Sequence, residues 1–361
     1  MVTTVFFFCC FSSFSQTAAT DSVIVQNLKQ YLQVLSQDDK FSGSVIVAHN
    51  GSIIYQVAYG KASKEYNAPV TLNTAFNLAS MTKMFTGVAV AQLAEQGKLA
   101  YSDPVNKYLP QLPKKLTEGI TIEHLLTHTS GLGSFWTDEF HNSNHAAYRT
   151  LDDYTKLIVN DSPQFTPGTK WAYSNTGYLL LGLVIEKITG MTYFNYVKKN
   201  VFEKAGMSAD FYEADMPVPG LATAYSRFNR YINDTSKISI PVFIGPVKGS
   251  PAGGAFASAI DMFKFSEALL GYKLLHQKST SDVVTGKAAY GRPEQQKKYG
   301  YGFANQVENG KLIVFHDGAA NGISTQLDIY PELGYTVIVL SNYDHPSSWN
   351  VVKRTRELIT K

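Results

Sequence analysis

Strand patterns lie at the two ends of this chain, and helical patterns lie between them. Residues 41–60 alternate apolar and polar side chains around Asn50-Gly51, the dipeptide that most strongly favours a two-residue hairpin turn. Near the C-terminus a helical pattern, about Trp349 to Ile359, follows four further strand-like runs: YGYGFANQV, GKLIVFHDG, ISTQLDIYP and YTVIVLSNY. We therefore expect the N-terminal hairpin to join the C-terminal strands in one antiparallel sheet.

The middle of the chain, from about residue 100 to 250, is rich in helical patterns such as TGYLLLGLVIEKITG and in proline and glycine breaks. The predicted fold class is therefore α/β, an antiparallel β-sheet flanked by helices with an inserted all-helical subdomain. At 361 residues with 44% hydrophobic content, the chain is long enough to bury a sizeable core. The two parts would share a cleft.

The N-terminus carries a short apolar run, Val5 to Phe14, followed by small residues. This pattern is typical of a signal peptide, predicted here as residues 1–20, although the usual positively charged leader is missing. The alternative is a frayed apolar tail; the run is too short to span a bilayer. Secretion, or export to a periplasm, would remove Cys9 and Cys10, the only cysteines, and with them any disulfide or thiol nucleophile.

The charge of the chain indicates which kinds of partner it can bind. The formal net charge of +3 is small for this length, and the lysines and arginines are spread along the sequence. No basic stripe indicates a nucleic-acid partner. We expect small-molecule partners, and nothing in the sequence specifies an oligomeric state.

Ser80 and Lys83 open an otherwise apolar, helix-patterned segment, Phe76 to Leu99. Residues three apart lie on one face of a helix, so the two side chains can meet there. Serine becomes nucleophilic when a nearby base takes its proton, and lysine is such a base only when burial depresses its pKa. The alternative is a helix-capping serine with a solvated lysine, and the apolar neighbours of Lys83 count against it.

Two further clusters carry groups suited to acyl transfer. Tyr173 and Asn175, in FTPGTKWAYSNTGYLLLG, precede an apolar helix; tyrosine can exchange a proton with lysine, and asparagine can both donate and accept. His316 ends the strand-like run GKLIVFHDG, where Gly318 would leave the N–H of Ala319 free to meet a substrate oxygen. Taken alone, each cluster has little specificity, and His316 by itself reads best as structural.

In this order, SMTK, YSN and HDG resemble the three active-site boxes of the penicillin-recognising serine hydrolases. The branch is that of class C β-lactamases, DD-peptidases, D-aminopeptidases and β-lactamase-type carboxylesterases. The resemblance runs from about residue 41 to 342 and is supported by four further stretches: GKLAYSDPVNKYLP, ITIEHLLTHTSGL, FTPGTKWAYSNTGYLLLGLVIEKITG and SPAGGAFASAIDMFKF. It implies that residues 21–361 form one hydrolase domain with the active site between its sheet and helical parts.

The resemblance also implies roles for the residues. Ser80 would be the nucleophile, Lys83 and Tyr173 the proton-transfer pair, and Asn175 the group that orients lysine and substrate. The backbone N–H groups of Ser80 and Ala319 would form the oxyanion hole, and no cofactor would be needed.

His316 stands where the β-lactamases of this branch carry a lysine. A histidine with a pKa near 6.5 is mostly neutral at pH 7 and binds a carboxylate less firmly than lysine does. We therefore expect small esters or D-amino-acid amides and peptides as substrates, rather than efficient β-lactam hydrolysis. A class C-like β-lactamase, a DD-carboxypeptidase and a receptor that is acylated once without turnover remain the alternatives.

His124 and His128 lie one helical turn apart and could be taken for metal ligands. No acidic third ligand and no H-E-x-x-H pattern accompanies them, and a metal site needs three or four ligands. We therefore predict no metal, and the resemblance assigns both histidines to the scaffold.

Overall fold

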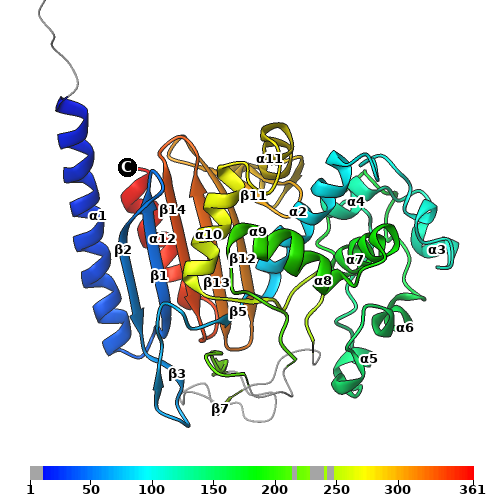
Figure 1. Ribbon diagram of the computed structural model, residues 1–361, viewed down its shortest axis with the longest axis horizontal. Helices are drawn as coiled ribbons and strands as arrows, with labels where there is room; N and C mark the ends of the chain where they lie inside the picture. The colour runs from blue at the N-terminus through cyan, green and yellow to red at the C-terminus, as the bar shows by residue number, and fades with distance from the viewer. Residues whose placement is uncertain (1–10, 214–217, 228–239, 242–247) are drawn as a thin grey trace, which may run out of the picture.

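The computed structural model describes residues 11–213, 218–227, 240–241 and 248–361 (Figure 1). Its main sheet is antiparallel with strand order β2-β1-β14-β13-β12-β11-β10-β9. The strands are β1 (Gly43–His49), β2 (Ser52–Tyr59), β9 (Ala288–Tyr290), β10 (Lys297–Tyr299), β11 (Ala304–Glu308), β12 (Lys311–Ala320), β13 (Ile323–Tyr330) and β14 (Tyr335–Ser341). β1 pairs with β14, which confirms that both chain ends build one sheet.

The predicted turn between β1 and β2 is also confirmed. Asn50 and Gly51 have φ angles of 49° and 74°, the left-handed values that a type I′ hairpin turn requires at both central positions. The run YGYGFANQV, however, was wrongly predicted as one strand, because it divides into β10 and β11. Its Gly302 has a φ of 86° and lies against the carbonyl oxygen of Lys83, where a Cβ would overlap that oxygen.

Helices cover both faces of the sheet. α1 (Phe11–Gln37) and α12 (Ser347–Ile359) pack together on one face, and α10 (Ala259–Leu270) packs on β1 and β14 from the other (Figure 1). Every residue of β13 and β14 is buried as a result, which explains the nearly continuous apolar run of β14. β13 also buries four polar residues, Ser324, Thr325, Gln326 and Asp328. The C-terminal helix is confirmed and begins two residues earlier than predicted.

The N-terminal expectation falls partly outside the described residues. Residues 1–10 are not described, and the chain from Phe11 onward belongs to α1. In the described part of the chain, no helix has both the length and the hydropathy needed to span a bilayer.

Between residues 105 and 205 the named elements are all helical. α2 (Thr82–Glu95) precedes them and is buried from Thr82 to Leu93, so it forms the core between the sheet and these helices. The remaining helices are α3 (Lys114–Thr117), α4 (Ile122–Leu126), α5 (Asp138–His141), α6 (Thr155–Ile158), α7 (Asn175–Thr189), α8 (Tyr193–Val197), α9 (Glu203–Ala205) and α11 (Gln277–Val284).

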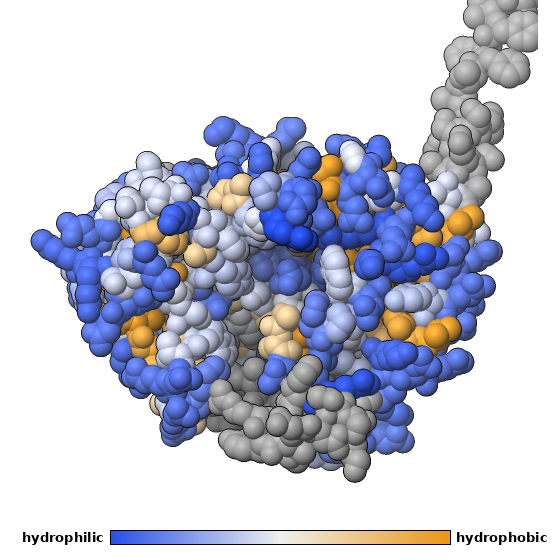
Figure 2. Space-filling view, turned by 180° about the vertical axis from the view of Figure 1, so that it is seen from behind, coloured by the Kyte–Doolittle hydropathy of each residue, from blue (hydrophilic) through white to orange (hydrophobic). Residues whose placement is uncertain are grey.

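Three short strand pairs complete the fold: β3 (Lys61–Ser63) with β4 (Ala68–Pro69), β5 (Phe76–Asn77) with β8 (Phe256–Ala257), and β6 (Tyr225–Ser226) with β7 (Ile240–Pro241). The pair β5–β8 brings residues 250–257 next to the segment that leads into α2. On the face shown in Figure 2, hydrophobic residues form small separate groups among hydrophilic ones.

Candidate active site

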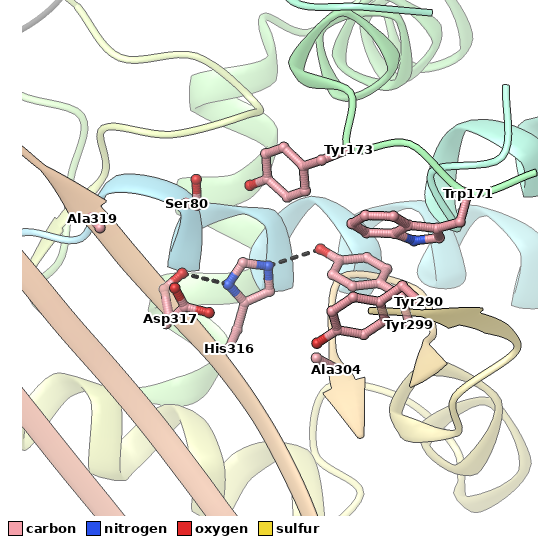
Figure 3. A pocket seen from close by; sticks show the side chains of 9 residues that line it. All are labelled: Ser80, Trp171, Tyr173, Tyr290, Tyr299, Ala304, His316, Asp317 and Ala319. Atoms are coloured by element: carbon pink, nitrogen blue, oxygen red, sulfur yellow. Dashed lines mark hydrogen bonds between the residues drawn. The ribbon is translucent and has the colours of Figure 1, made fainter. Parts of the chain in front are cut away.

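Ser80 lies in a single 3-10 turn, η1 (Ala79–Met81), directly before α2. The residue before it, Ala79, has a φ of 45°, an uncommon value for a residue with a Cβ. Two hydrogen bonds hold this conformation: the Ala79 N–H donates to Asn77 Oδ1 at 2.9 Å, and Thr82 Oγ1 donates to the Ala79 carbonyl at 2.8 Å. The turn places Ser80 on the wall of a pocket of about 330 Å³ (Figure 3).

Lys83 is fully buried beneath this pocket. Its Nζ lies 3.3 Å from Ser80 Oγ, 2.9 Å from Asn175 Oδ1 and 2.5 Å from the carbonyl oxygen of Ala252. Burial lowers the pKa of Lys83 well below its usual value, and the negative charge of Asp317 only partly opposes this. The lysine is therefore poised to lose its charge.

Two of the three hydrogen-bond partners of Lys83 Nζ can only accept, and the third is Ser80 Oγ. The oxygens of Asn175 and Ala252 carry no hydrogen, so each must accept a hydrogen bond from Nζ. A neutral amine has two hydrogens for these two acceptors and one lone pair left over. That lone pair can accept the hydroxyl proton of Ser80, as a general base must.

Tyr173 forms the opposite wall of the pocket, and its hydroxyl points toward Ser80 (Figure 3). Although 39% of the residue is exposed, burial around the hydroxyl raises the pKa of Tyr173 above its usual value, and a hydrogen bond with Ser80 opposes that rise. The Lys83 Nζ lies 4.7 Å from the centre of the Tyr173 ring. Tyr173 is thus a proton donor at neutral pH, and Lys83 is the better base.

Asn175 begins α7, and its amide is held from both ends. Its Nδ2 donates to Ser134 Oγ at 3.0 Å while its Oδ1 accepts from Lys83, which fixes the amide orientation. Ser174 caps the helix by accepting the Gly177 N–H at 2.8 Å. Tyr193, which is also followed by an asparagine two positions later, is buried, and its hydroxyl lies 2.7 Å from Thr86 Oγ1.

His128 holds the chain on both sides of Tyr173. The Ala172 N–H donates to the His128 carbonyl at 2.9 Å, and the Ser174 N–H donates to His128 Nδ1 at 3.1 Å. The His128 ring also packs against the Tyr173 ring, with centroids 4.4 Å apart. Burial, with nearby Lys83, lowers the pKa of His128 well below its usual value, so the ring is neutral. Its partner in the sequence pattern, His124, caps α4 instead.

His316 lines the pocket from β12 but has no free ring nitrogen. Its Nδ1 lies 2.7 Å from the Asp317 carbonyl oxygen and must donate to it, so Nε2 accepts from the Tyr299 hydroxyl at 2.8 Å. Burial lowers the pKa of His316 to about 4, against the opposing charge of Asp317. The expected neutral histidine is thus supported, but its nitrogens face the protein rather than a substrate.

The end of β12 leaves one strand edge open beside Ser80. β11 pairs with β12 only as far as Phe315, and the segment beyond it packs on η1 instead. Gly318 allows this close approach, because a Cβ there would overlap the carbonyl oxygen of Leu78. Ala319 is exposed on the pocket wall, so Ser80 and Ala319 lie at the same end of the pocket (Figure 3).

Sequence reasoning missed five pocket residues. Trp171, Tyr290, Tyr299, Ala304 and Asp317 line the pocket with the predicted residues (Figure 3). Asp317 and Trp171 were signalled by their places beside the HDG and YSN motifs. Tyr290 and Tyr299 come from β9 and β10, and no local pattern marks them.

A serine beside a buried lysine, between an antiparallel sheet and a helical region, is the arrangement of the β-lactamase-type serine hydrolases. Residues 25–360 match the Beta-lactamase family. A penicillin-binding protein of Bacillus subtilis (strain 168) is 30% identical over 339 residues, which is 90% of this chain and 74% of the relative. The crystal structure of a penicillin-binding protein from Bacillus halodurans has a TM-score of 0.82 at 29% identity, over 91% of this chain and 98% of the other.

A more distant structure, the D-amino acid amidase from Ochrobactrum anthropi SV3, shares the fold with a TM-score of 0.76 at 21% identity, over 94% of this chain and 99% of the other. The chain belongs to the Beta-lactamase family, which confirms the resemblance drawn from SMTK, YSN and HDG.

Proposed function

We propose that the protein is an exported serine hydrolase that forms an acyl-enzyme on Ser80 and hydrolyses small esters or D-amino-acid amides and peptides. The single observation that carries this proposal is the contact of 3.3 Å between Ser80 Oγ and the Nζ of a buried, hydrogen-bonded lysine. A merely structural lysine has no reason to be buried with a depressed pKa beside an accessible hydroxyl.

The mechanism begins with proton transfer from Ser80 to Lys83. The Ser80 oxygen then attacks the substrate carbonyl carbon, and the carbonyl oxygen gains the negative charge. The backbone N–H groups of Ser80 and Ala319 are the proposed donors to that oxygen. When the tetrahedral intermediate collapses, the bond to the leaving group breaks, and Tyr173 supplies the departing group with a proton.

Water then attacks the acyl-enzyme. Lys83 returns its proton to Tyr173, so both groups regain their starting states. Lys83 takes a proton from the attacking water and gives it to Ser80 Oγ when the tetrahedral intermediate collapses and the bond between the acyl group and Ser80 breaks. Asn175 keeps the Lys83 amine oriented throughout, because its own amide is fixed by Ser134.

The charge of the pocket supports esters and amides over carboxylate-bearing β-lactams. His316 is neutral and bonded at both nitrogens, and the adjacent Asp317 presents a negative charge to the pocket. The names of the similar proteins, penicillin-binding proteins and a D-amino acid amidase, agree with D-amino-acid amides or peptides as a substrate class. A DD-carboxypeptidase is the second candidate, because both penicillin-binding relatives match nearly the whole chain.

Steady-state turnover of a neutral p-nitrophenyl ester tests this function. A hydrolase releases p-nitrophenol continuously, whereas a receptor acylated once releases a burst of one equivalent and then stops. Continuous release that is absent in Ser80→Ala supports the proposal. A single burst would contradict turnover and favour the receptor, and a panel of β-lactams and D-Ala-D-Ala peptides would then rank the substrates.

A further inference from the structure

We propose that the pocket selects substrates carrying a positively charged amine, with Asp317 as the counter-charge and the rings of Trp171 and Tyr290 as an aromatic wall. The inference rests on the proposed hydrolase function and specifies its substrate class. Neither the family match nor the three active-site motifs assigns a role to these side chains.

Asp317 is an unpartnered carboxylate in the pocket wall. It is exposed, and no described residue forms a hydrogen bond or ion pair with its side chain. His316 and Tyr173 carry no charge at neutral pH, and Lys83, whose pKa burial lowers well below its usual value, lies beneath the pocket and does not line it. Asp317 therefore sets the sign of the potential in the pocket.

The basic side chain that could cancel this charge is Lys297 on β10. Its ammonium group interacts with Asp317 electrostatically, but the two form no ion pair and Lys297 does not line the pocket. The carboxylate thus remains available to a ligand.

Aromatic faces supply the second half of a cation site. Trp171 and Tyr290 stack with ring centroids 4.7 Å apart and an interplanar angle of 24°, and both are half-buried on the pocket wall. Tyr173 adds a third, partly exposed ring (Figure 3). Ammonium groups are attracted to such faces. Asp317 lines the same pocket and interacts electrostatically with Tyr290.

The strand geometry fixes where the cation would lie relative to the reacting bond. Asp317 and Ala319 are two apart on β12, so their side chains point to the same face and lie roughly 7 Å apart along the strand. A carbonyl held at Ser80 and Ala319 would then place a group a few bonds away beside Asp317. Small amino esters, amino amides and choline-like esters have this spacing.

A pair of isosteric thioesters tests the inference directly. Acetylthiocholine and S-(3,3-dimethylbutyl) thioacetate differ only in carrying a trimethylammonium or a tert-butyl group, and both release a thiol that can be measured. We expect kcat/KM to favour the cationic ester by about tenfold, since a charge-assisted contact and a cation–π contact each contribute a few-fold or more. The preference should shrink as salt is raised, because Asp317 is exposed to screening.

The decisive comparison is Asp317→Asn, which keeps the side-chain shape and removes the charge. Its ratio of the two kcat/KM values should fall to about threefold or less, and Trp171→Leu should lower the ratio as well. Glu332→Gln is the matched control, because Glu332 is exposed in the turn after β13 and outside the pocket. An equal ratio in wild type and Asp317→Asn would overturn the inference.

A binding measurement separates this inference from the proposed function. Ser80→Ala cannot form an acyl-enzyme, so choline and 3,3-dimethylbutanol can be titrated into it by calorimetry. Asp317-dependent binding of choline without any ester turnover would refute the hydrolase and retain the cation site. Ester turnover with no preference for the cation, and no choline binding, would refute the cation site and retain the hydrolase.

Discussion

At the scale of single residues, the site contains several buried groups whose pKa values burial shifts toward the uncharged form. Burial lowers the pKa values of Lys83, His128 and His316, and it raises the pKa of Tyr173. The pKa shift serves the chemistry in two of these residues: it makes Lys83 a base and Tyr173 a proton donor beside Ser80. In the two histidines the pKa is lowered because each ring is buried, where it forms hydrogen bonds that hold neighbouring segments together.

The shifted pKa of His316 predicts a loss of stability in mild acid. Its pKa is about 4 in the folded protein and near 6.5 in the unfolded chain, so between these values the unfolded chain binds the proton and the folded protein does not. The free energy of unfolding should therefore fall as the pH drops from about 6.5 to about 4, by up to about 3 kcal/mol from this residue.

Urea unfolding at pH 7 and pH 4.5 measures this effect. His316→Asn lacks the titrating ring, so its free energy of unfolding should change less between the two pH values than that of the wild type. His128 titrates in the same direction in both proteins and provides a common background. An identical pH dependence in the two proteins would show that His316 is not buried in its neutral form.

At the scale of elements, the site depends on contacts between η1 and β12 and on contacts between the Tyr173 segment and the loop after α4. η1 packs on the open edge of β12, and the chain around Tyr173 is held to the loop after α4 by His128. His128 itself has a φ of 60°, which is unusual for a residue with a Cβ. The position of the Tyr173 hydroxyl is thus set by a residue that does not line the pocket.

His128→Ala and His128→Asn separate this positioning role from simple packing. Alanine leaves the buried Ser174 N–H without an acceptor, which should cost about 1 to 3 kcal/mol of stability and lower kcat. Asparagine tolerates the left-handed backbone and offers an oxygen near the place of Nδ1, so it should restore part of kcat. Equal kcat values for the two variants would argue against the clamp.

At the scale of the whole molecule, the two ends of the chain build the sheet and the part between them completes the site. The hairpin at Asn50-Gly51 and the runs that became β12, β13 and β14 were predictable, because turn chemistry and apolar alternation are local properties. Ser80 and Lys83 were identifiable for the same reason, since helix geometry relates residues three apart.

Features that depend on contacts between distant segments were not predictable. Gly302, between β10 and β11, lies against the backbone of Lys83, and Tyr290 comes to the pocket from β9 at the sheet edge. The hydrogen bond to His316 Nε2 likewise comes from Tyr299, which lies in another part of the sheet. No periodicity or motif in the sequence indicates these long-range contacts.

Covalent labelling of the nucleophile tests the central claim most directly. The protein is treated with a fluorophosphonate, and the adduct is counted by intact mass and located by peptide mass spectrometry. We predict one adduct per chain, on Ser80, abolished in Ser80→Ala at an unchanged melting temperature and retained in Ser281→Ala, which changes an exposed serine of α11 outside the pocket. An adduct on another serine, or labelling that survives in Ser80→Ala, would contradict the account.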